Sequence, residues 1–477
     1  MGNDSTDDTS RGARWLSRAL FVCGVAVAAV TVLYLVLLGR MAFVDWSRGK
    51  GWLLLFTPAL GLLAYVLLAR GRRGARGAPV RWLAVVLALA ALWPAWEAYA
   101  WMRGPQMYVW TWWQRENPES ARPVGAWLLP SKGLARARTD GVFVYNGEGR
   151  SAGGLAAAEG TTLCALSRAT SHETGLVASA RTPGGCGSRV SAVDLREGRQ
   201  LWAKDFPAAP SRDRDAVPVA AVDGTAVAVT QGALLGLDLR GGAERWRAPV
   251  PAGCEVRALD GAAGRVLYVE DCSGGGDGGA ARLTALDART GTVAWQSPLR
   301  TPGTSGPHTE LRMVSARPIA LRAGESVLLF DDSGHERGAV PVSGPREDLL
   351  TEPGPLVSGD LLITPVKDKV PGVSAYSLVD GHRVWHAALD GATVLGIAQG
   401  RSPGGADVVT STAARTYLWH LDGSTGRRKA EPAILRDVPL GRRFEIYPEA
   451  AEGYTFVNLD AGGELPAFFA LGRVRGW

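Results

Sequence analysis

The sequence is poor in the residues and motifs on which many enzyme sites depend. Its 477 residues include only six histidines and five cysteines, and neither a P-loop nor an H-E-x-x-H motif occurs. These absences exclude P-loop nucleotide hydrolases and the common zinc peptidases. Lysine is also scarce, so arginine supplies nearly all of the 52 basic residues. That arginine bias, with abundant alanine and glycine, favours a GC-rich bacterial source such as an actinobacterium.

An excess of positive charge is confined to one end of the chain. Residues 1–103 carry seven more basic than acidic residues, whereas residues 104–477 are close to neutral. The larger part of the chain therefore offers no basic face to a phosphate backbone, which argues against nucleic acid as a partner.

A three-residue pattern recurs in the middle of the chain: an aspartate, a glycine four residues later and a tryptophan eight residues later. The copies are Asp194, Gly198 and Trp202; Asp238, Gly242 and Trp246; and Asp287, Gly291 and Trp295. Each copy joins two strand-like hydrophobic runs, so the unit is a strand, a tight glycine-containing turn and a second strand. A hairpin repeat of about 45 residues is typical of β-propeller blades.

Weaker copies extend the repeat in both directions. They are Ser377, Gly381 and Trp385; Asp422 and Gly426 with Ala430 in place of tryptophan; Gly334 with Gly338 in that place; and the turn glycines Gly149 and Gly463. Counted by turn glycine, there are eight copies, which predicts an all-β propeller of eight blades. Because the first and last copies are the poorest, seven blades, one of them closed by both chain ends, are the alternative.

The repeat resembles that of the pyrroloquinoline quinone (PQQ) propeller family, whose consensus is roughly A-x-D-x-x-T-G-x-x-x-W. The segment ALDARTGTVAW at 285–295 carries the resemblance most clearly, and weaker similarity covers about 140–477. The resemblance implies a propeller in which the repeat tryptophans pack as wedges between blades. Because the family includes both quinoprotein dehydrogenases and propellers without a cofactor, it implies no particular reaction.

Three long apolar runs precede the repeats, and each has the length needed to cross a bilayer. We expect transmembrane helices at about 15–38, 52–69 and 82–101. The expected organisation is a cytoplasmic tail at 1–14, a membrane domain at 15–103, a juxtamembrane linker at 104–125 and a propeller at 126–477.

Arginines between the second and third runs set the expected orientation. The link at 70–81 holds five arginines and no acidic residue, and short basic loops stay in the cytoplasm. The chain is therefore expected to be a multi-pass membrane protein with a cytoplasmic amino terminus and an extracytoplasmic propeller. Glu97, near the end of the third run, is interpreted as interfacial, with a functional carboxyl at membrane depth as the alternative.

Four cysteines fall in the expected propeller as two local pairs. Cys164 with Cys186 and Cys254 with Cys272 each lie within one repeat, ahead of its turn. An even number of cysteines in an exported domain predicts two disulfides within blades, with four buried thiols as the alternative. Cys23, alone in an apolar run, is expected to be a packing residue.

No catalytic, cofactor-binding or metal-ligating residues are assigned from the sequence. His382 and His386 have the spacing of helical metal ligands, but they lie on a predicted turn and strand. The segment CSGGGDGG at 272–279 lacks a second carboxylate for calcium, and VKDKV at 366–370 reads as a solvated charge cluster.

The sequence therefore favours a noncatalytic binding or scaffold module in the bacterial cell envelope, anchored in the lipid bilayer and binding a protein or envelope ligand. The alternative is a PQQ-dependent membrane dehydrogenase that passes electrons to quinone. Its layout would resemble that of the membrane-bound quinoprotein glucose dehydrogenases, and it would require PQQ with calcium. None of the cofactor or calcium ligands of those enzymes aligns with this sequence.

Overall fold

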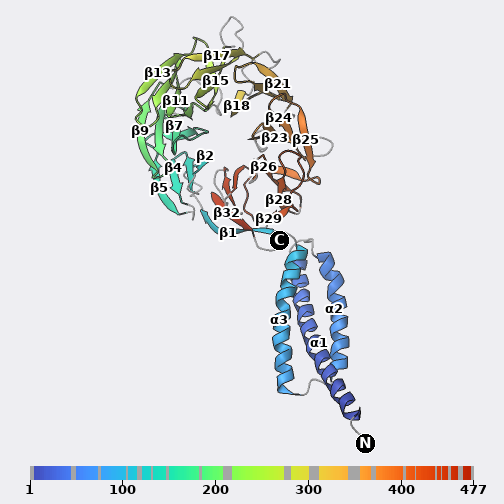
Figure 1. The fold of residues 1–477 in the computed structure, drawn as a ribbon. Coiled ribbons are helices and arrows are strands. Elements are labelled where there is room, and N and C mark those ends of the chain that lie inside the picture. Colours follow the sequence, from blue (N-terminus) through green and yellow to red (C-terminus); the bar gives the residue numbers. More distant parts are fainter. Residues whose placement is uncertain are drawn as a thin grey trace. The chain divides into compact units, whose positions relative to one another are not determined.

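The computed structural model divides the chain into two units, Met1–Met107 with Arg473–Trp477 and Tyr108–Gly472. Figure 1 shows the helices of the first unit and the ring of strands of the second. The structure describes residues 5–43, 50–72, 77–103, 106–114, 121–129, 133–146, 150–181, 185–207, 217–272, 281–299, 311–341, 355–366, 372–400, 404–413, 415–435, 438–441, 443–448, 453–459 and 466–473.

Three helices form the first unit: α1 (Ser5–Phe43), α2 (Lys50–Gly71) and α3 (Ala78–Arg103). Each includes an apolar stretch long enough to cross a membrane, at Arg14–Gly39, Gly51–Gly71 and Ala78–Met102. The prediction of three such helices is confirmed. The first helix begins earlier than expected and includes much of the segment predicted as a tail.

Small residues bring α1 and α2 close together. A Cβ added to Gly24 would lie 3.0 Å from the side chain of Leu68, and one added to Gly71 would lie 2.5 Å from the backbone nitrogen of Phe21. Across to α3, the hydroxyl of Tyr34 donates to the carbonyl oxygen of Ala95 at 3.1 Å. Such a bond satisfies a polar group that lipid could not.

Two side chains of interest lie on the outside of the helical unit. Glu97 of α3 is exposed on this unit, so its carboxyl does not point into the three-helix core. Cys23 of α1 is also exposed and forms no disulfide. Cys23, expected to be a packing residue, therefore does not pack between the three helices.

The second unit is a propeller whose first six blades are four-stranded antiparallel sheets of consecutive strands. Blade 1 comprises β2 (Pro123–Leu128), β3 (Leu134–Arg138), β4 (Gly141–Tyr145) and β5 (Ser151–Ala156). Blade 2 comprises β6 (Thr162–Leu166), β7 (Thr174–Ala180), β8 (Arg189–Asp194) and β9 (Arg199–Asp205). Blade 3 comprises β10 (Val219–Val222), β11 (Thr225–Thr230), β12 (Ala233–Asp238) and β13 (Glu244–Pro249).

Blades 4 to 6 repeat this arrangement. Blade 4 comprises β14 (Glu255–Ala262), β15 (Arg265–Asp271), β16 (Arg282–Asp287) and β17 (Val293–Pro298). Blade 5 comprises β18 (Leu311–Ala316), β19 (Ile319–Ala323), β20 (Ser326–Phe330) and β21 (Glu336–Pro341). Blade 6 comprises β22 (Leu356–Ser358), β23 (Leu361–Val366), β24 (Gly372–Ser377) and β25 (Arg383–Ala388).

Blades 7 and 8 share one eight-stranded sheet. Blade 7 comprises β26 (Thr393–Gln399), β27 (Ala406–Ser411), β28 (Thr416–Leu421) and β29 (Ala433–Leu435). Blade 8 comprises β30 (Phe444–Pro448), β31 (Tyr454–Asn458), β32 (Phe468–Arg473) and β1 (Gln106–Gln114). Because the order is β26-β27-β28-β29-β1-β32-β31-β30, the strand that precedes blade 1 in the sequence completes blade 8 and closes the ring.

The prediction of eight blades is confirmed, and the seven-blade alternative is wrong. Closure of one blade by both ends of the chain, which the seven-blade alternative proposed, does occur, but in a blade separate from the one that holds the first repeat. The segment 104–125, expected to be a linker, contains β1 and the start of β2. Its residues MYVWTWWQ have the aromatic composition of a strand as well as that of a membrane interface.

The tryptophans of the repeat join each blade to the next. The indole nitrogens donate to carbonyl oxygens of the following blade: Trp202 to Leu239 at 2.8 Å, Trp246 to Ala288 at 2.9 Å, Trp295 to Asp332 at 2.9 Å and Trp385 to Gly423 at 2.6 Å. Leu239, Ala288 and Gly423 directly follow the first residue of the next copy of the repeat, and Asp332 lies two residues before the turn glycine Gly334. The indole ring lies against the turn glycine of that copy, so a Cβ on Gly291 would meet Trp246 at 2.6 Å.

At two seams, those between blades 5 and 6 and between blades 1 and 2, a glycine stands in place of the repeat tryptophan and the backbones of the two blades approach directly. Gly338 of β21 occupies the register position of the tryptophan, opposite Leu329. A Cβ there would lie 2.9 Å from the carbonyl oxygen of Asp380, and one on Gly381 would lie 3.0 Å from that of Ala339. Gly153 of β5 allows the same direct approach of backbone between blades 1 and 2. Glycine at position 338 thus allows the turn of blade 6 to approach the strand directly.

The seams around blade 8 contain buried polar contacts. Asp407 of blade 7 accepts from the hydroxyl of Tyr454 of blade 8 at 2.6 Å and lies 2.8 Å from Nδ1 of His420. On the other side, Arg136 of blade 1 donates to the carbonyl oxygen of Ala467 at 2.8 Å. These bonds are directional, so they help to fix the register of the closing blade.

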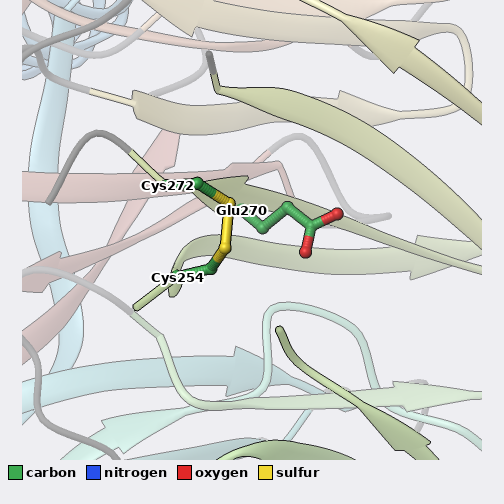
Figure 2. Close-up of side chains that lie close together, drawn as sticks. All are labelled: Cys254, Glu270 and Cys272. Carbon is green, nitrogen blue, oxygen red and sulfur yellow. A yellow bond between two sulfur atoms is a disulfide. The ribbon is translucent and has the colours of Figure 1, made fainter. Parts of the chain in front are cut away.

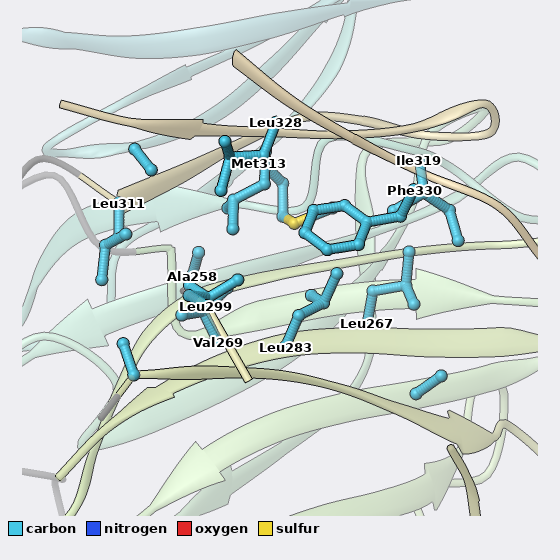
Figure 3. Close-up of a cluster of buried hydrophobic side chains, with 14 residues drawn as sticks. Ala258, Leu267, Val269, Leu283, Leu299, Leu311, Met313, Ile319, Leu328 and Phe330 are labelled. Carbon is cyan, nitrogen blue, oxygen red and sulfur yellow. The ribbon is translucent and has the colours of Figure 1, made fainter. Parts of the chain in front are cut away.

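Elsewhere, apolar side chains fill the space between adjacent blades. Figure 3 shows the cluster between blades 4 and 5, where Leu267, Val269 and Leu283 face Met313 and Phe330. Inner and middle strands are buried on both faces, as a blade between two neighbours requires. The propeller core is therefore a ring of separate inter-blade cores.

We expect Trp246→Ala to lower the free energy of unfolding by about 3–5 kcal/mol, because the substitution removes a buried indole and leaves a cavity in its place. Trp246→Phe should lower the free energy of unfolding by less, because the phenyl ring retains part of the packing and the substitution removes one hydrogen bond of about 1 kcal/mol. Trp295→Ala should cost less than Trp246→Ala, because Trp295 is only partly buried. Val293→Ala, at a position 56% exposed, is the control. Denaturant unfolding of the detergent-solubilised chain measures all four, and equal stability of the wild type and Trp246→Ala would contradict the structural role.

Candidate functional site

The aspartates of the repeat serve the turns that begin with them. In the copy at 287, Asp287 Oδ1 accepts from the backbone nitrogens of Arg289 and Thr290, each at 2.9 Å. Asp194, Asp238 and Asp422 make equivalent bonds, and Ser377 supplies its hydroxyl in the same way. The glycine that ends each turn has a positive φ, 70° at Gly291 and 67° at Gly426. These residues shape turns and do not converge on one site.

The hydrogen bonds of the turns favour the charged form of the aspartates. The hydroxyls of Ser424 and Thr425 lower the pKa of Asp422 to about 2, and the backbone nitrogen of Gly241 is the main cause of the lowered pKa of Asp238. The pKa of Asp287 is also lowered, chiefly by the backbone and hydroxyl of Thr290. All three side chains are partly exposed and the pKa of each is lowered, so the carboxylates remain ionised near neutral pH.

The structure contains both predicted disulfides. Cys164 bonds Cys186 in blade 2, with a Cα–Cα distance of 5.8 Å, and Cys254 bonds Cys272 in blade 4, at 4.1 Å. The sequence alternative of four free thiols is therefore not adopted.

A buried carboxylate lies beside the second disulfide. Ligand atoms of Cys254, Glu270 and Cys272 all lie within 4.8 Å of one another (Figure 2). The two sulfurs are bonded to each other, so they cannot act as thiolate ligands in this state. Sequence reasoning missed Glu270, although it lies only two residues before Cys272, which directly follows β15, and residues two apart in an extended chain point to the same side.

An arginine crosses the centre of the ring at one end. Arg168 lies in the connection between β6 and β7 of blade 2, and its Nη1 lies 3.4 Å from Oδ2 of Asp260 in blade 4. The same nitrogen donates to the carbonyl oxygen of Met313 in blade 5 at 3.1 Å. Burial raises the pKa of Asp260, and the charge of Arg168 opposes that shift. One side chain thus links a connection of blade 2 to the first strands of blades 4 and 5.

A cavity of about 720 Å³ opens at the same end of blades 5 and 6. It is formed by four connections: those between β18 and β19, β20 and β21, β22 and β23, and β24 and β25. These turns lie together because the first and third connections of a four-stranded antiparallel sheet fall at one edge. The cavity adjoins the seam in which Gly338 replaces tryptophan.

The cavity combines an apolar floor with unpaired charges. Ile319, Phe330 and Leu378 are buried in its wall, whereas Val379 is 50% exposed. The carboxylates of Asp332 and Asp360 and the guanidinium of Arg317 also line it. Among the described residues, these three charged side chains have no hydrogen-bond or ion-pair partner. Such groups are available to a ligand that has both charge and apolar surface.

The cavity does not suit PQQ, which carries three carboxylates. Asp331, Asp332 and Asp360 place three carboxylates around the cavity, against the guanidinium groups of Arg317 and Arg337. Arg337 is also paired, because its Nε lies 3.7 Å from Oδ2 of Asp331. The centre of the ring at this end is crossed by Arg168. The residues around this cavity therefore do not form a site for this cofactor.

The histidines considered as metal ligands have separate partners. Nδ1 of His382 lies 2.6 Å from Asp380 in the turn, whereas Nδ1 of His386 lies 3.0 Å from the hydroxyl of Ser374 on the adjacent strand. The glycine-rich segment after Cys272 and most of the cluster at 366–370 lie outside the described residues.

One enzyme-like motif escaped the sequence analysis. Residues 149–153 read G-R-S-A-G, the spacing of a serine hydrolase nucleophile elbow. That elbow requires a strand, a sharp turn and a helix, whereas Ser151 is exposed at the start of β5, paired with β4. The local structure is that of a hairpin, so the match is not a catalytic site.

The fold and its repeat define an eight-bladed β-propeller with PQQ-like repeats. A family model described as outer membrane protein assembly factor BamB matches residues 187–429, and the chain belongs to this family.

Two solved structures can be compared with the chain. BamB from Moraxella catarrhalis is 15% identical, with a TM-score of 0.46 over 74% of this chain and 99% of that chain. Sqt1 from Saccharomyces cerevisiae is 10% identical, with a TM-score of 0.47 over 77% and 99% of the two chains. No curated protein matches the chain in sequence.

We expect Asp422→Asn to lower the thermal midpoint at pH 7, with a difference from the wild type that shrinks as the solution is acidified. The folded pKa of about 2 lies below the unfolded value of about 3.9. The contribution of the carboxylate is therefore complete above about pH 4 and lost as pH falls through about 2. Asp360→Asn, whose carboxylate is unpaired, should leave the midpoint unchanged. A difference for Asp422→Asn that stayed constant from pH 6 to pH 2 would contradict this account.

Proposed function

We propose that this protein is a noncatalytic binding module of the bacterial cell envelope, held in the membrane by its three helices. The propeller binds a protein partner at the end that carries the cavity of blades 5 and 6. The observation that supports this proposal most directly is the cavity of about 720 Å³, with its exposed Val379 and its unpaired aspartates. Membership of a propeller family described as an assembly factor supports a binding or scaffold role.

The chemistry of the cavity supports a protein ligand over a small anionic one. Asp332 and Asp360 attract a cationic group, Arg317 attracts an anionic one, and Phe330 with Val379 offers apolar contact. A protein segment carries all three kinds of group within a few residues. Pockets with a few polar groups set among apolar side chains commonly act as anchor points in protein interfaces.

The membrane part of the proposal rests on the three apolar helices and on the arginines between α2 and α3. Each helix is long enough to cross a bilayer. The basic link favours a cytoplasmic position, which would place the propeller outside the cytoplasm.

A photocrosslinking amino acid at Val379 should capture a discrete protein partner in intact cells. The same amino acid at Val293 is the matched control, because Val293 of β17 is 56% exposed but is not one of the residues that line the cavity. Replacing Asp332 and Asp360 with asparagine should weaken the crosslink at Val379 several-fold.

Equal crosslinking at both positions, or none at Val379, would contradict the proposed surface. The dehydrogenase alternative is tested with the same purified protein, incubated with PQQ and calcium. Dye reduction that depends on an alcohol or sugar would overturn the noncatalytic proposal.

Cysteine labelling tests the orientation. In a Cys23→Ser background, a membrane-impermeant maleimide should label Gln399→Cys, an exposed position, in intact cells. Gly77→Cys, in the link between α2 and α3, should react only after the membrane is permeabilised. The reverse pattern would place the propeller in the cytoplasm.

A further inference from the structure

The disulfide of blade 4 lies beside a carboxylate that has one oxygen without a partner. Glu270 is 1% exposed, and its Oε2 is buried with no hydrogen bond within the described part of the chain. A buried unpartnered carboxylate oxygen is costly and calls for an explanation. A carboxylate oxygen of Glu270 and the sulfurs of Cys254 and Cys272 all lie within 4.8 Å of one another.

The other oxygen of Glu270 is held in place by the next strand. Oε1 accepts from Nε of Arg282, the residue opposite Glu270 in the β15–β16 register, and from the hydroxyl of Thr284 at 3.3 Å. Metal-binding carboxylates are typically oriented by such second hydrogen bonds. Arg282 and Thr284 thus fix the carboxyl group and leave Oε2 available.

We propose that reduction of the Cys254–Cys272 disulfide creates a zinc site with two sulfur ligands and one oxygen ligand, in which Glu270 Oε2 is the third protein ligand. A dithiol reductant transfers two electrons and two protons to the disulfide, giving two thiols and an oxidised reductant. Zinc then displaces the two thiol protons and binds both thiolates. Water takes the fourth position, because both cysteines are partly exposed.

The geometry and the charges suit this ion. Zinc lies about 2.3 Å from sulfur and about 2.0–2.2 Å from carboxylate oxygen, so its ligand atoms lie roughly 3.5–4 Å apart. The ligand atoms of the three residues now lie up to 4.8 Å apart, so they must move closer by about 1 Å. Side-chain rotation supplies this movement once the sulfurs are no longer bonded to each other. Two thiolates, one carboxylate and Zn²⁺ leave one negative charge, which the guanidinium of Arg282 balances.

The disulfide of blade 2 provides an internal control. Neither Cys164 nor Cys186 belongs to a cluster of possible metal ligands among the described residues. Reduction of that disulfide should therefore create no comparable site.

The test measures zinc bound by the full chain in detergent, before and after anaerobic reduction with a phosphine that is then removed. We expect one zinc ion per reduced chain, none in the oxidised chain, and a thiolate-to-metal charge-transfer band when Co²⁺ replaces zinc. Glu270→Gln should weaken zinc binding by at least about tenfold, because losing a residue that only orients a ligand already lowers metal affinity by about that factor. Cys254→Ser with Cys272→Ser should abolish binding, whereas Cys164→Ser with Cys186→Ser should retain it.

Circular dichroism of each reduced chain separates loss of the site from loss of the fold. If reduction unfolds the chain, added zinc should restore the folded signal in the wild type and not in Glu270→Gln. Failure of zinc to bind or to restore the fold would overturn the proposal, as would equal zinc affinity of Glu270→Gln and the wild type.

Discussion

The contact between an outer-strand tryptophan and the turn glycine of the next blade is the interaction on which the ring depends. A four-stranded blade has two apolar faces and cannot bury them alone. The indole of Trp246 covers the turn of blade 4 and donates to the backbone of Ala288. The glycine of that turn meets two constraints at once: it allows the positive φ, and it leaves room for the ring. The aspartate, the glycine and the tryptophan of the repeat therefore act across blade boundaries.

The exceptions to this contact are as informative as the contact itself. Where Gly338 stands for tryptophan, blade 6 approaches blade 5 through its backbone, and no indole covers the neighbouring turn. Val379 in that turn remains half exposed, and the cavity with the unpaired Asp332 and Asp360 lies beside it. Departures from a consistent pattern tend to mark functional positions. The break in the repeat and the proposed binding surface thus coincide in one pair of blades.

The sequence predicted the features that depend on local periodicity. Blade number follows from the spacing of turn glycines, the three helices follow from apolar length, and the cysteine pairs follow from their common position within a repeat. The contacts of Arg168 could not be predicted, because its partners lie about 90 and 145 residues away on other blades. The cavity could not be predicted from the sequence either, because four turns from two blades form it together. Strand β1 was assigned to a linker because alternating aromatics suit both a strand and a membrane interface.

Closing the ring poses a problem that the repeat does not solve. Blade 8 joins β1 to strands from the other end of the chain, so no short hairpin fixes its register. At both of its seams the structure uses buried polar contacts, Tyr454 with Asp407 on one side and Arg136 with the carbonyl of Ala467 on the other. Apolar contacts tolerate a shift of register better than hydrogen bonds do, because burial is non-directional. In the other blades, short turns between consecutive strands fix the strand register. In the closing blade, the polar contacts help to fix it. β1 follows α3 after only two residues, so the strand that closes the propeller is also the strand nearest in sequence to the apolar helices.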